Sequence, residues 1–335
     1  MSMDQTIVLR KSGESLTDYW IRLFEHKDEY NLSCVQIADL LNEAYGVTYT
    51  ESRWRKNYRL FEAGRQYERQ RLEGGVATRI LCLSDLHVPF QLPVSTFRQY
   101  AGQIDVLVLN GDIGDCQAIS KFPKAYRISP MEELIETRQY LLELIVELAP
   151  SKVIVTYGNH DMRFQNYLAK SLDSDILELM PQTSLELLFV DGFNHYNKRY
   201  QTKSYYPPLA DVLIDVLGDI EIEYTNNWWT QIGDTIICHP IAFSSGMMQT
   251  AKKAKEYFQD LGLCPAQIIL GHTHKVGMYR LGNVMMYEQG CCCDVTKLHY
   301  GDGRLTSPQQ MGYICFGQDI NGHTVPSSVN LVSLN

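Results

Sequence analysis

The chain has no apolar run close to the ~20 residues that a membrane-spanning helix needs, and its first residues lack the charged and then apolar pattern of a signal peptide. A surplus of basic residues is also missing, because 30 Lys and Arg face 39 Asp and Glu and give a net charge of −9 at pH 7. This balance argues against a wholly basic nucleic-acid coat. No internal repeat or low-complexity tract stands out. We therefore expect a globular protein in the cytoplasm, with no membrane partner.

The chain has nine cysteines, but their spacings do not match those of zinc sites or of disulfide-bonded domains. Three of the nine, Cys291, Cys292 and Cys293, stand in one run. That run fits neither paired C-x-x-C zinc ligands nor an ordered disulfide framework. Free thiols in a reducing cytosol are the better interpretation.

Five apolar stretches each run into aspartate, asparagine or histidine, as a buried strand runs into a polar turn. Ligand sites in layered α/β proteins lie beyond the carboxyl ends of strands, so all five ends are expected to converge on one place. A single such residue is more often an ordinary turn residue, but a series of five favours a site. The stretches are Leu81–Leu83 before Asp85 and His87, Val106–Asn110 before Asp112 and Asp115, Val153–Tyr157 before Asn159, His160 and Asp161, Thr235–Cys238 before His239, and Ile268–Leu270 before His272 and His274.

The series D-x-H, G-D-x-x-D, G-N-H-[DE], H and G-H-x-H, in this order, is similar to the signature of the calcineurin-like metallophosphoesterases. The resemblance covers about residues 76–320. It implies an α/β fold of two packed β-sheets flanked by helices. It also implies hydrolysis of phosphate esters by a metal-bound hydroxide at a centre with two divalent ions.

The resemblance assigns a role to each residue of the series. His160 would be the general acid that protonates the leaving oxygen, and Asp115 would keep that imidazole protonated and oriented. Asp161 is expected to orient its turn. Mixed nitrogen and oxygen ligands favour Mn²⁺, Fe or Zn²⁺ over Mg²⁺ or Ca²⁺, and manganese, which the family often uses, is the expected ion. The implied ligands are Asp85, His87, Asp112 and His274 for one ion and Asp112, Asn159, His239 and His272 for the other, with Asp112 bridging.

At two places the sequence departs from the motifs of particular subfamilies, which argues against close kinship with them. Protein phosphatases of this superfamily follow the second motif with Arg-Gly and end the third in Glu, where this chain has Cys116-Gln117 and Asp161. The nuclease of double-strand-break repair usually carries His where Asp115 stands. A helical module ahead of a calcineurin-like domain resembles phage-encoded phosphoesterases instead, which would place the protein in the host-cell cytoplasm.

Residues 1–75 are expected to form a small all-α domain that resembles a helix-turn-helix module. Ser15 and Ser33 are suited to cap two helices, Gly46 stops the second, and a third helix starts near Thr50. The third helix is basic, with seven Arg or Lys against three acids between Glu51 and Arg71. An ordinary three-helix cap with a solvated basic face is nearly as good an interpretation. The predicted nucleic-acid contacts on this helix are Arg53, Arg55, Lys56 and Arg59.

Residues 76–335 are expected to form the metallophosphoesterase domain, with an insertion at about 162–230. Arg163 is a candidate substrate contact at the start of this insertion. Between Tyr196 and Tyr206 aromatic residues alternate with cations, which suits stacking of bases and binding of phosphates. A surface insertion whose tyrosines cover their own small core fits equally well. The last dozen residues are polar and are expected to fray.

Three functions are consistent with these features. The first is a phosphodiesterase that acts on nucleic acid or a nucleotide, with the N-terminal module guiding the substrate. The second is a phosphomonoesterase on a small molecule or phosphoprotein, with the module serving assembly. The third is a catalytically silent accessory subunit that binds nucleic acid, but the complete set of metal ligands argues against it. The sequence leaves homo-oligomerisation open.

Overall fold

The computed structural model describes residues 8–334 except residue 74 and the segments 121–127, 242–243, 245, 247 and 299–307, and it leaves the side chains of 66–73 undescribed. The chain divides into two compact units, Met1–Gly74 and Gly75–Asn335. All nine cysteines are free thiols. Within the described part of the chain, every helix is too short or too polar to cross a membrane.

The first unit consists of three helices, α1 (Leu16–Glu25), α2 (Cys34–Tyr45) and α3 (Glu51–Glu73). Ser15 and Ser33 cap α1 and α2 as predicted, and Ser33 forms a full capping box with Gln36. The left-handed Gly46 ends α2. The helices pack around one core, and its buried members are Tyr19, Leu23, Ile37, Ala38, Leu41 and Trp54.

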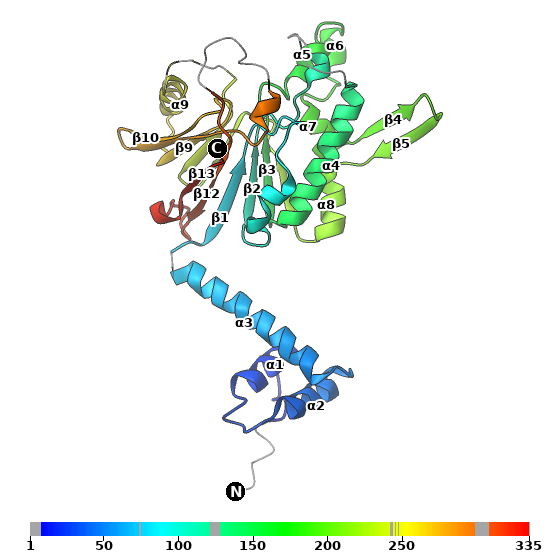
Figure 1. Ribbon diagram of the computed structural model, residues 1–335, viewed down its shortest axis with the longest axis vertical. Helices are drawn as coiled ribbons and strands as arrows, with labels where there is room; N and C mark the ends of the chain where they lie inside the picture. Colours follow the sequence, from blue (N-terminus) through cyan, green and yellow to red (C-terminus); the bar gives the residue numbers. More distant parts are fainter. Residues whose placement is uncertain are drawn as a thin grey trace. The chain divides into compact units, whose positions relative to one another are not determined.

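The second unit contains a six-stranded sheet in the order β13-β12-β1-β2-β3-β6 (Figure 1). Strands β1, β2, β3 and β6 run parallel, and β12 and β13 complete the sheet as antiparallel neighbours. The strands are β1 (Thr78–Leu83), β2 (Val106–Asn110), β3 (Lys152–Thr156), β6 (Glu221–Tyr224), β12 (Gly312–Gln318) and β13 (Asn330–Ser333).

A five-stranded sheet in the order β10-β11-β9-β8-β7 faces the first. Its three middle strands, β11, β9 and β8, run parallel, and the outer strands are antiparallel to their neighbours. The strands are β7 (Trp229–Ile232), β8 (Thr235–Cys238), β9 (Gln267–Leu270), β10 (Val276–Leu281) and β11 (Val284–Gln289).

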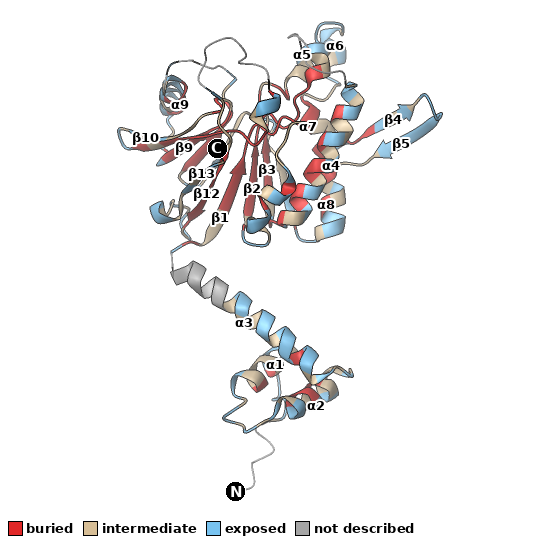
Figure 2. Cartoon of the chain, viewed as in Figure 1, coloured by how far each residue is buried: buried red, intermediate tan, exposed pale blue. Residues whose placement is uncertain are grey.

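Apolar residues on both faces of the strands explain the layers. On β1, Ile80 and Cys82 pack between the sheets, where they meet Ile237 and Ile269 of the second sheet. Leu81 and its alternate neighbours point the other way, toward helices α4 (Pro130–Leu148) and α8 (Leu209–Leu217). Helix α9 (Gln249–Asp260) covers the outer face of the second sheet. The inner strands of both sheets are therefore mostly buried, and Figure 2 colours them mainly red, whereas the edge strands β6, β7, β10 and β13 are only partly buried. The predicted fold, two packed sheets flanked by helices, is confirmed.

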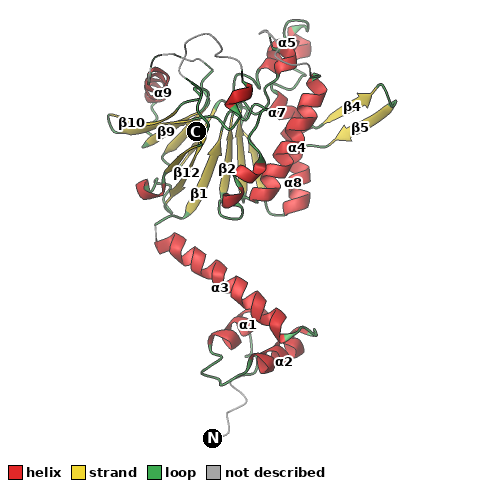
Figure 3. Ribbon diagram, in the orientation of Figure 1, coloured by secondary structure: helices red, strands yellow, loops and turns green. Residues whose placement is uncertain are grey.

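Short elements fill the rest of the second unit. Between β3 and β6 lie the hairpin β4 (Phe193–Asn197) and β5 (Thr202–Tyr206) and three short helices. Figure 3 colours the helices red and the strands of the hairpin yellow. The helices are α5 (Arg163–Leu168), α6 (Ser174–Leu177) and α7 (Ser184–Glu186), and the other turns of helix are Val94–Thr96, Arg98–Tyr100, Gln117–Ile119, Leu187–Asp191, Val295–Lys297 and Pro326–Ser328.

Two boundaries differ from the sequence prediction. The segment set apart as an insertion, 162–230, ends inside the core, because β6 pairs with β3 and β7 pairs with β8. The expected fraying of the last dozen residues is wrong, since Asn330–Ser333 pairs with β12. Leu331 and Val332 pack against two different core clusters, and this burial holds the polar tail in the sheet.

A buried carboxyl on α4 gives a first testable prediction. Burial raises the pKa of Glu133 from 4.5 to about 7, and its Oε1 accepts a hydrogen bond from the backbone N–H of Gln117 at 3.0 Å. The folded state tolerates the protonated Glu133 better than the charged form. Its contribution to stability is therefore complete below pH 4.5 and is lost as the pH rises through 7. Glu133→Gln keeps the acceptor and removes the charge. We expect it to raise the free energy of unfolding by about 2–3 kcal/mol at pH 8, with a gain that shrinks toward pH 4.5.

Urea unfolding at several pH values measures this gain. The matched control is Glu136→Gln, which removes an exposed carboxyl from the same helix. An equal gain for Glu133→Gln at pH 5 and pH 8 would show that the buried carboxyl does not titrate as described.

Candidate metal centre

The loops that follow β1, β2, β3, β8 and β9 bring the predicted residues together at the carboxyl ends of the strands. The potential ligand atoms form three groups, and the atoms within a group all lie within 4.8 Å of one another. Asp112 and His87 each belong to two groups, so the groups form one connected centre. The groups are Asp85, His87 and His274; Asp112, His239 and His272; and His87, Asp112 and His160.

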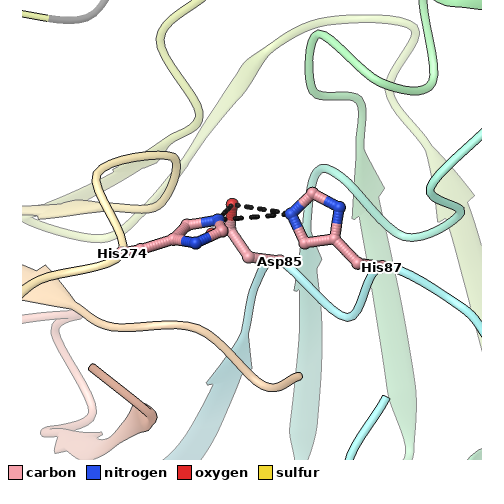
Figure 4. Close-up of side chains that lie close together, drawn as sticks. All are labelled: Asp85, His87 and His274. Atoms are coloured by element: carbon pink, nitrogen blue, oxygen red, sulfur yellow. Dashed lines mark hydrogen bonds and ion pairs between the residues drawn. The ribbon is translucent and has the colours of Figure 1, made fainter. Parts of the chain in front are cut away.

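The first group brings together side chains that lie far apart in the sequence of the second unit. His274 Nε2 lies 3.0 Å from Asp85 Oδ1 and 3.2 Å from His87 Nε2. Figure 4 shows the three side chains pointing toward one another. Two ring nitrogens and a carboxylate oxygen that converge in this way are suited to hold one cation.

The second group lies on the other side of Asp112. Asp112 Oδ2 is 3.2 Å from His239 Nε2 and 4.0 Å from His87 Nε2, so the carboxylate of Asp112 stands between the first and second groups. Asn159 Oδ1 and His239 Nε2 are both buried, and neither has a hydrogen-bond partner among the described residues. Buried polar atoms are rarely left without a partner, and these two are placed to coordinate a cation.

The third group contains His160, the predicted general acid. Its Nε2 lies 3.9 Å from Asp112 Oδ2, so the geometry alone would also allow it as a ligand. Its Nδ1 donates to the backbone oxygen of Asp115 at 2.9 Å, and its Nε2 accepts from Arg163 Nη2 at 2.9 Å. The ring is therefore held as the tautomer with its proton on Nδ1.

One prediction about His160 needs correction. The sequence predicts that Asp115 keeps this imidazole protonated, and its Oδ1 does lie 3.1 Å from His160 Nδ1. Burial, together with the neighbouring His87 and Arg163, nevertheless lowers the pKa of His160 although Asp112 and Asp115 raise it. Asp115 also contacts the other side of the centre, where its Oδ1 is 3.1 Å from His87 Nδ1. Its carboxylate thus orients two imidazoles rather than one.

Asp161 ties two of the loops together. Its Oδ2 accepts hydrogen bonds from the backbone N–H groups of Asp112 at 2.8 Å and Gly158 at 2.9 Å. Its Oδ1 accepts from the N–H of Ile113 at 3.3 Å. The carboxylate faces backbone donors rather than the ligand groups, and it fixes the loops that carry Asp112 and Asn159.

The backbone at the centre is strained. Asp85, His87, Asp112, His272 and His274 all adopt positive φ, between 46° and 71°, a region that residues other than glycine rarely occupy. Such strain gathers at functional sites, where the surrounding structure holds it in place.

Glycines let the loops approach each other closely. A Cβ at Gly111, which has φ of 72°, would lie 2.6 Å from the ring of His239. A Cβ at Gly158 would collide with the carboxylate of Asp112. The glycines of the G-D and G-N-H motifs are therefore needed for the side chains of the centre to meet.

Two residues support the centre without belonging to the series of motifs. Ser84 Oγ hydrogen-bonds to the carboxylate of Asp85 and donates to the backbone oxygen of Asn110 at 2.8 Å. His239 Nδ1 donates to the same oxygen at 2.7 Å, which leaves His239 Nε2 free to face Asp112. The buried Cys292 donates its N–H to the backbone of Ser84 at 3.0 Å, so the cysteine run supports the same loop. Ser84 directly precedes Asp85 in the sequence, but neither Ser84 nor Cys292 has the charge or imidazole that marks a ligand.

The predicted substrate residues lie in two places. Arg163 is beside the centre, where its Nη1 donates to the backbone oxygen of Asp115 at 2.7 Å. The other four are exposed on α3, in the first unit. Two of them make local contacts, since the guanidinium of Arg53 lies 3.7 Å from the centre of the Tyr49 ring and Arg55 is 3.3 Å from Glu51.

Comparison with known proteins gives two family matches. Residues 78–276 match the family model of the calcineurin-like phosphoesterases, and residues 4–73 match that of the YonJ N-terminal domain. The SPbeta prophage-derived uncharacterized protein YonJ of Bacillus subtilis (strain 168) is 36% identical over 69 residues, which are 21% of this chain. The matched segment spans only 17% of that protein's length.

Solved structures give weaker likenesses. A metallophosphoesterase from Sphaerobacter thermophilus is 17% identical, with 74% of this chain and 88% of that chain covered and a TM-score of 0.33. Vps29 from Entamoeba histolytica, in complex with Zn²⁺, is 15% identical over 77% of this chain and 99% of its own, with a TM-score of 0.35. Likenesses of this size carry no argument about function.

Proposed function

Because the chain belongs to the calcineurin-like phosphoesterase family and is a metal-dependent phosphoesterase, we propose that it is a phosphodiesterase acting on nucleic acid or nucleotides. The observation that carries the choice of substrate is the set of four exposed cations on α3, in a chain whose net charge is −9. A polyanionic substrate would be drawn to this surface in preference to the acidic remainder of the chain.

The proposed centre holds two divalent ions. Asp85, His87, Asp112 and His274 would hold one, and Asp112, Asn159, His239 and His272 would hold the other. When bound, such ions neutralise phosphoryl oxygens and lower the pKa of water. The donors include four imidazoles, which favours Mn²⁺, Fe or Zn²⁺ over Mg²⁺, and we propose Mn²⁺.

The residues around the proposed ions have separate tasks. His160 would deliver a proton to the leaving oxygen from Nε2, which lies at the edge of the ligand groups. For this Nε2 must first take up a proton and release Arg163, whose guanidinium now donates to it. We propose that an incoming phosphate provides the exchange, by drawing Arg163 into a charge-assisted hydrogen bond. Asp115 and Asp161 would orient the rings and loops.

An assay of substrate classes separates the diesterase from the monoesterase alternative. The protein, supplied with Mn²⁺, is compared on p-nitrophenyl phosphate, its bis-ester, and single- and double-stranded nucleic acid. We expect the diesters to be hydrolysed with the higher kcat/KM. Preference for the monoester would favour the phosphomonoesterase and leave the first unit an assembly domain. A cytoplasmic location, a phage origin and homo-oligomerisation stay predictions.

The basic face of α3 gives a prediction about substrate delivery. If its four cations contact phosphates of a duplex, log Kd should change with log salt by about 0.9 per phosphate contacted. Changing all four to alanine should flatten that slope by up to about 3.6 and raise KM on polynucleotides. The set is Arg53, Arg55, Lys56 and Arg59. Fluorescence anisotropy over a salt series measures the slope.

A matched control changes cations elsewhere on the chain. Lys252 and Lys253 are exposed on α9, and the double change to alanine removes charge without touching α3. The ratio of kcat/KM on a polynucleotide to kcat/KM on a small ester should fall for the α3 variant and hold for the control. Normal binding of DNA and RNA by the α3 variant would exclude this helix as a nucleic-acid reader.

A further inference from the structure

The β4–β5 hairpin projects from the body of the second unit, and most of its outer part is exposed (Figures 1 and 2). We propose that this hairpin is a second binding surface, outside the metal centre, for single-stranded nucleic acid. The proposal rests on the proposed function, because it supplies a polynucleotide substrate with a place to bind in addition to the metal centre.

The aromatic side chains of the hairpin do not form a core of their own. Tyr196, Tyr200 and Tyr205 are 56%, 65% and 59% exposed. The base of the hairpin is anchored, where the rings of Phe193 and Tyr206 stack at 4.9 Å. Exposed rings of this size present a flat apolar surface to solvent, which is suited to stacking on another planar group.

The register places two of the exposed tyrosines and one cation on the same face. Phe193 pairs with Tyr206, and this buried end defines the inner face. Tyr196 lies directly opposite Lys203, and Tyr205 is the diagonal neighbour of Tyr196 on the same, outer face. Diagonal neighbours on a sheet lie about 7–8 Å apart, so the two tyrosines offer adjacent platforms with a cation between them.

The charge of the hairpin is complementary to a phosphate backbone. Residues 193–206 contain Lys198, Arg199 and Lys203 and no acidic residue. None of these three cations has a carboxylate within 4.0 Å among the residues that the structure describes. Arg199 lies over the ring of Tyr200 at 5.4 Å, so its guanidinium extends the flat surface. A segment of charge +3 on a chain of charge −9 is therefore an isolated basic patch.

Aromatic platforms interleaved with cations favour single strands over duplexes. Unpaired bases can stack on tyrosine and guanidinium groups while the phosphates meet the cations. In a duplex the faces of the bases are covered by their neighbours, and stacking on the hairpin would require them to separate. The sequence pattern allows either this role or a self-covered insertion, and the exposure of the rings favours the first.

Binding of labelled oligothymidylate and oligouridylate to the full-length protein, followed by fluorescence anisotropy without added metal, tests the proposal. We expect Tyr196→Ala with Tyr205→Ala to weaken binding about 20-fold or more, because each stacked base contributes ~1–3 kcal/mol. The matched variant Tyr196→Phe with Tyr205→Phe keeps both rings and should keep the affinity. Changing Lys198, Arg199 and Lys203 to Gln should reduce the salt slope by about 2.

Two controls isolate the contribution of the hairpin. Repeating the series in the α3 quadruple variant removes any binding by the first unit, and thermal unfolding shows whether the alanine variant is folded. Wild-type binding by both the tyrosine and the cation variants would overturn the proposal, as would preference for duplex over single strands. A change from dimer to monomer in the alanine variant, with oligonucleotide binding intact, would make the hairpin a self-association element instead. The binding assay does not depend on turnover. If the protein binds single strands but the separate substrate assay shows no diester hydrolysis, only the proposed function is refuted.

Discussion

Asp112→Asn is expected to reduce hydrolysis of bis(p-nitrophenyl) phosphate to the background rate and to lower the metal content of the protein. The carboxylate stands between the two ligand groups, with Oδ2 at 3.2 Å from His239 Nε2 and 4.0 Å from His87 Nε2. Its Oδ1 accepts the N–H of His160 at 2.7 Å, so the same side chain also positions the predicted acid. Asparagine has nearly the same shape but no charge, and it would weaken both metal positions at once.

The rate with added Mn²⁺ and the metal content by elemental analysis check this expectation. Asp105→Asn is a matched control, because Asp105 precedes the same strand β2 at its amino end and binds the backbone N–H of Arg79 there. The control should keep its metal. A near wild-type rate for Asp112→Asn, with two ions bound per chain, would exclude the assignment of the centre.

The second large effect separates the predicted acid from a ligand. His160→Ala should lower the rate by about 10²–10⁴-fold, the usual contribution of a positioned proton donor, while the metal content stays near that of wild type. His239→Ala should instead lose metal, because His239 Nε2 is buried and faces Asp112. Paired measurements of rate and metal content on both variants make the comparison.

Leaving groups sharpen the contrast. A substrate that releases p-nitrophenolate needs little protonation, so the defect of His160→Ala should shrink on it and grow on an alkyl or nucleoside leaving group. The exposed His323 offers a control, since His323→Ala removes an imidazole far along the chain from every ligand group. Equal loss of metal in His160→Ala and His239→Ala would make His160 a ligand, which the third group of side chains permits geometrically.

The ordered series of motifs made most of the fold and the centre predictable from sequence. Each predicted ligand follows a short apolar strand, and strand and ligand are close enough in sequence to be recognised together. The N-caps Ser15 and Ser33 were predictable for the same reason, because a cap is defined by the three residues that follow it. The positions of the ligands and the starts of these two helices were therefore predictable from local sequence patterns.

The features that the sequence did not reveal depend on contacts between distant segments. Ser84 meets Asn110 across 26 residues and His239 across 155, and nothing near Ser84 in the chain indicates either contact. Strand β13 forms because β12 offers it an edge, although its own sequence is short and only half apolar. The pKa of His160 likewise depends on how completely the loops bury it, which the motif position of Asp115 does not indicate.

For the β4–β5 hairpin, the sequence did not show which side chains would be exposed. Its tyrosines and cations were visible in the sequence, but the same residues could have packed on one another or faced solvent. Exposure depends on which neighbours cover a strand, and the pairing of Phe193 with Tyr206 decides which face turns inward. Residue parity along β4 and β5 then places Tyr196, Lys203 and Tyr205 together on the open face.

The long separation of Asp85 from His274 has a consequence for synthesis. Their ligand atoms lie 3.0 Å apart, yet 189 positions separate them along the chain. At ~5–20 residues per second, a ribosome needs about 10–40 s to pass from one to the other. Throughout that interval the nascent chain carries Asp85 without His274, so the first group of ligands is incomplete. A cation held by this group of side chains would therefore be bound only late in synthesis.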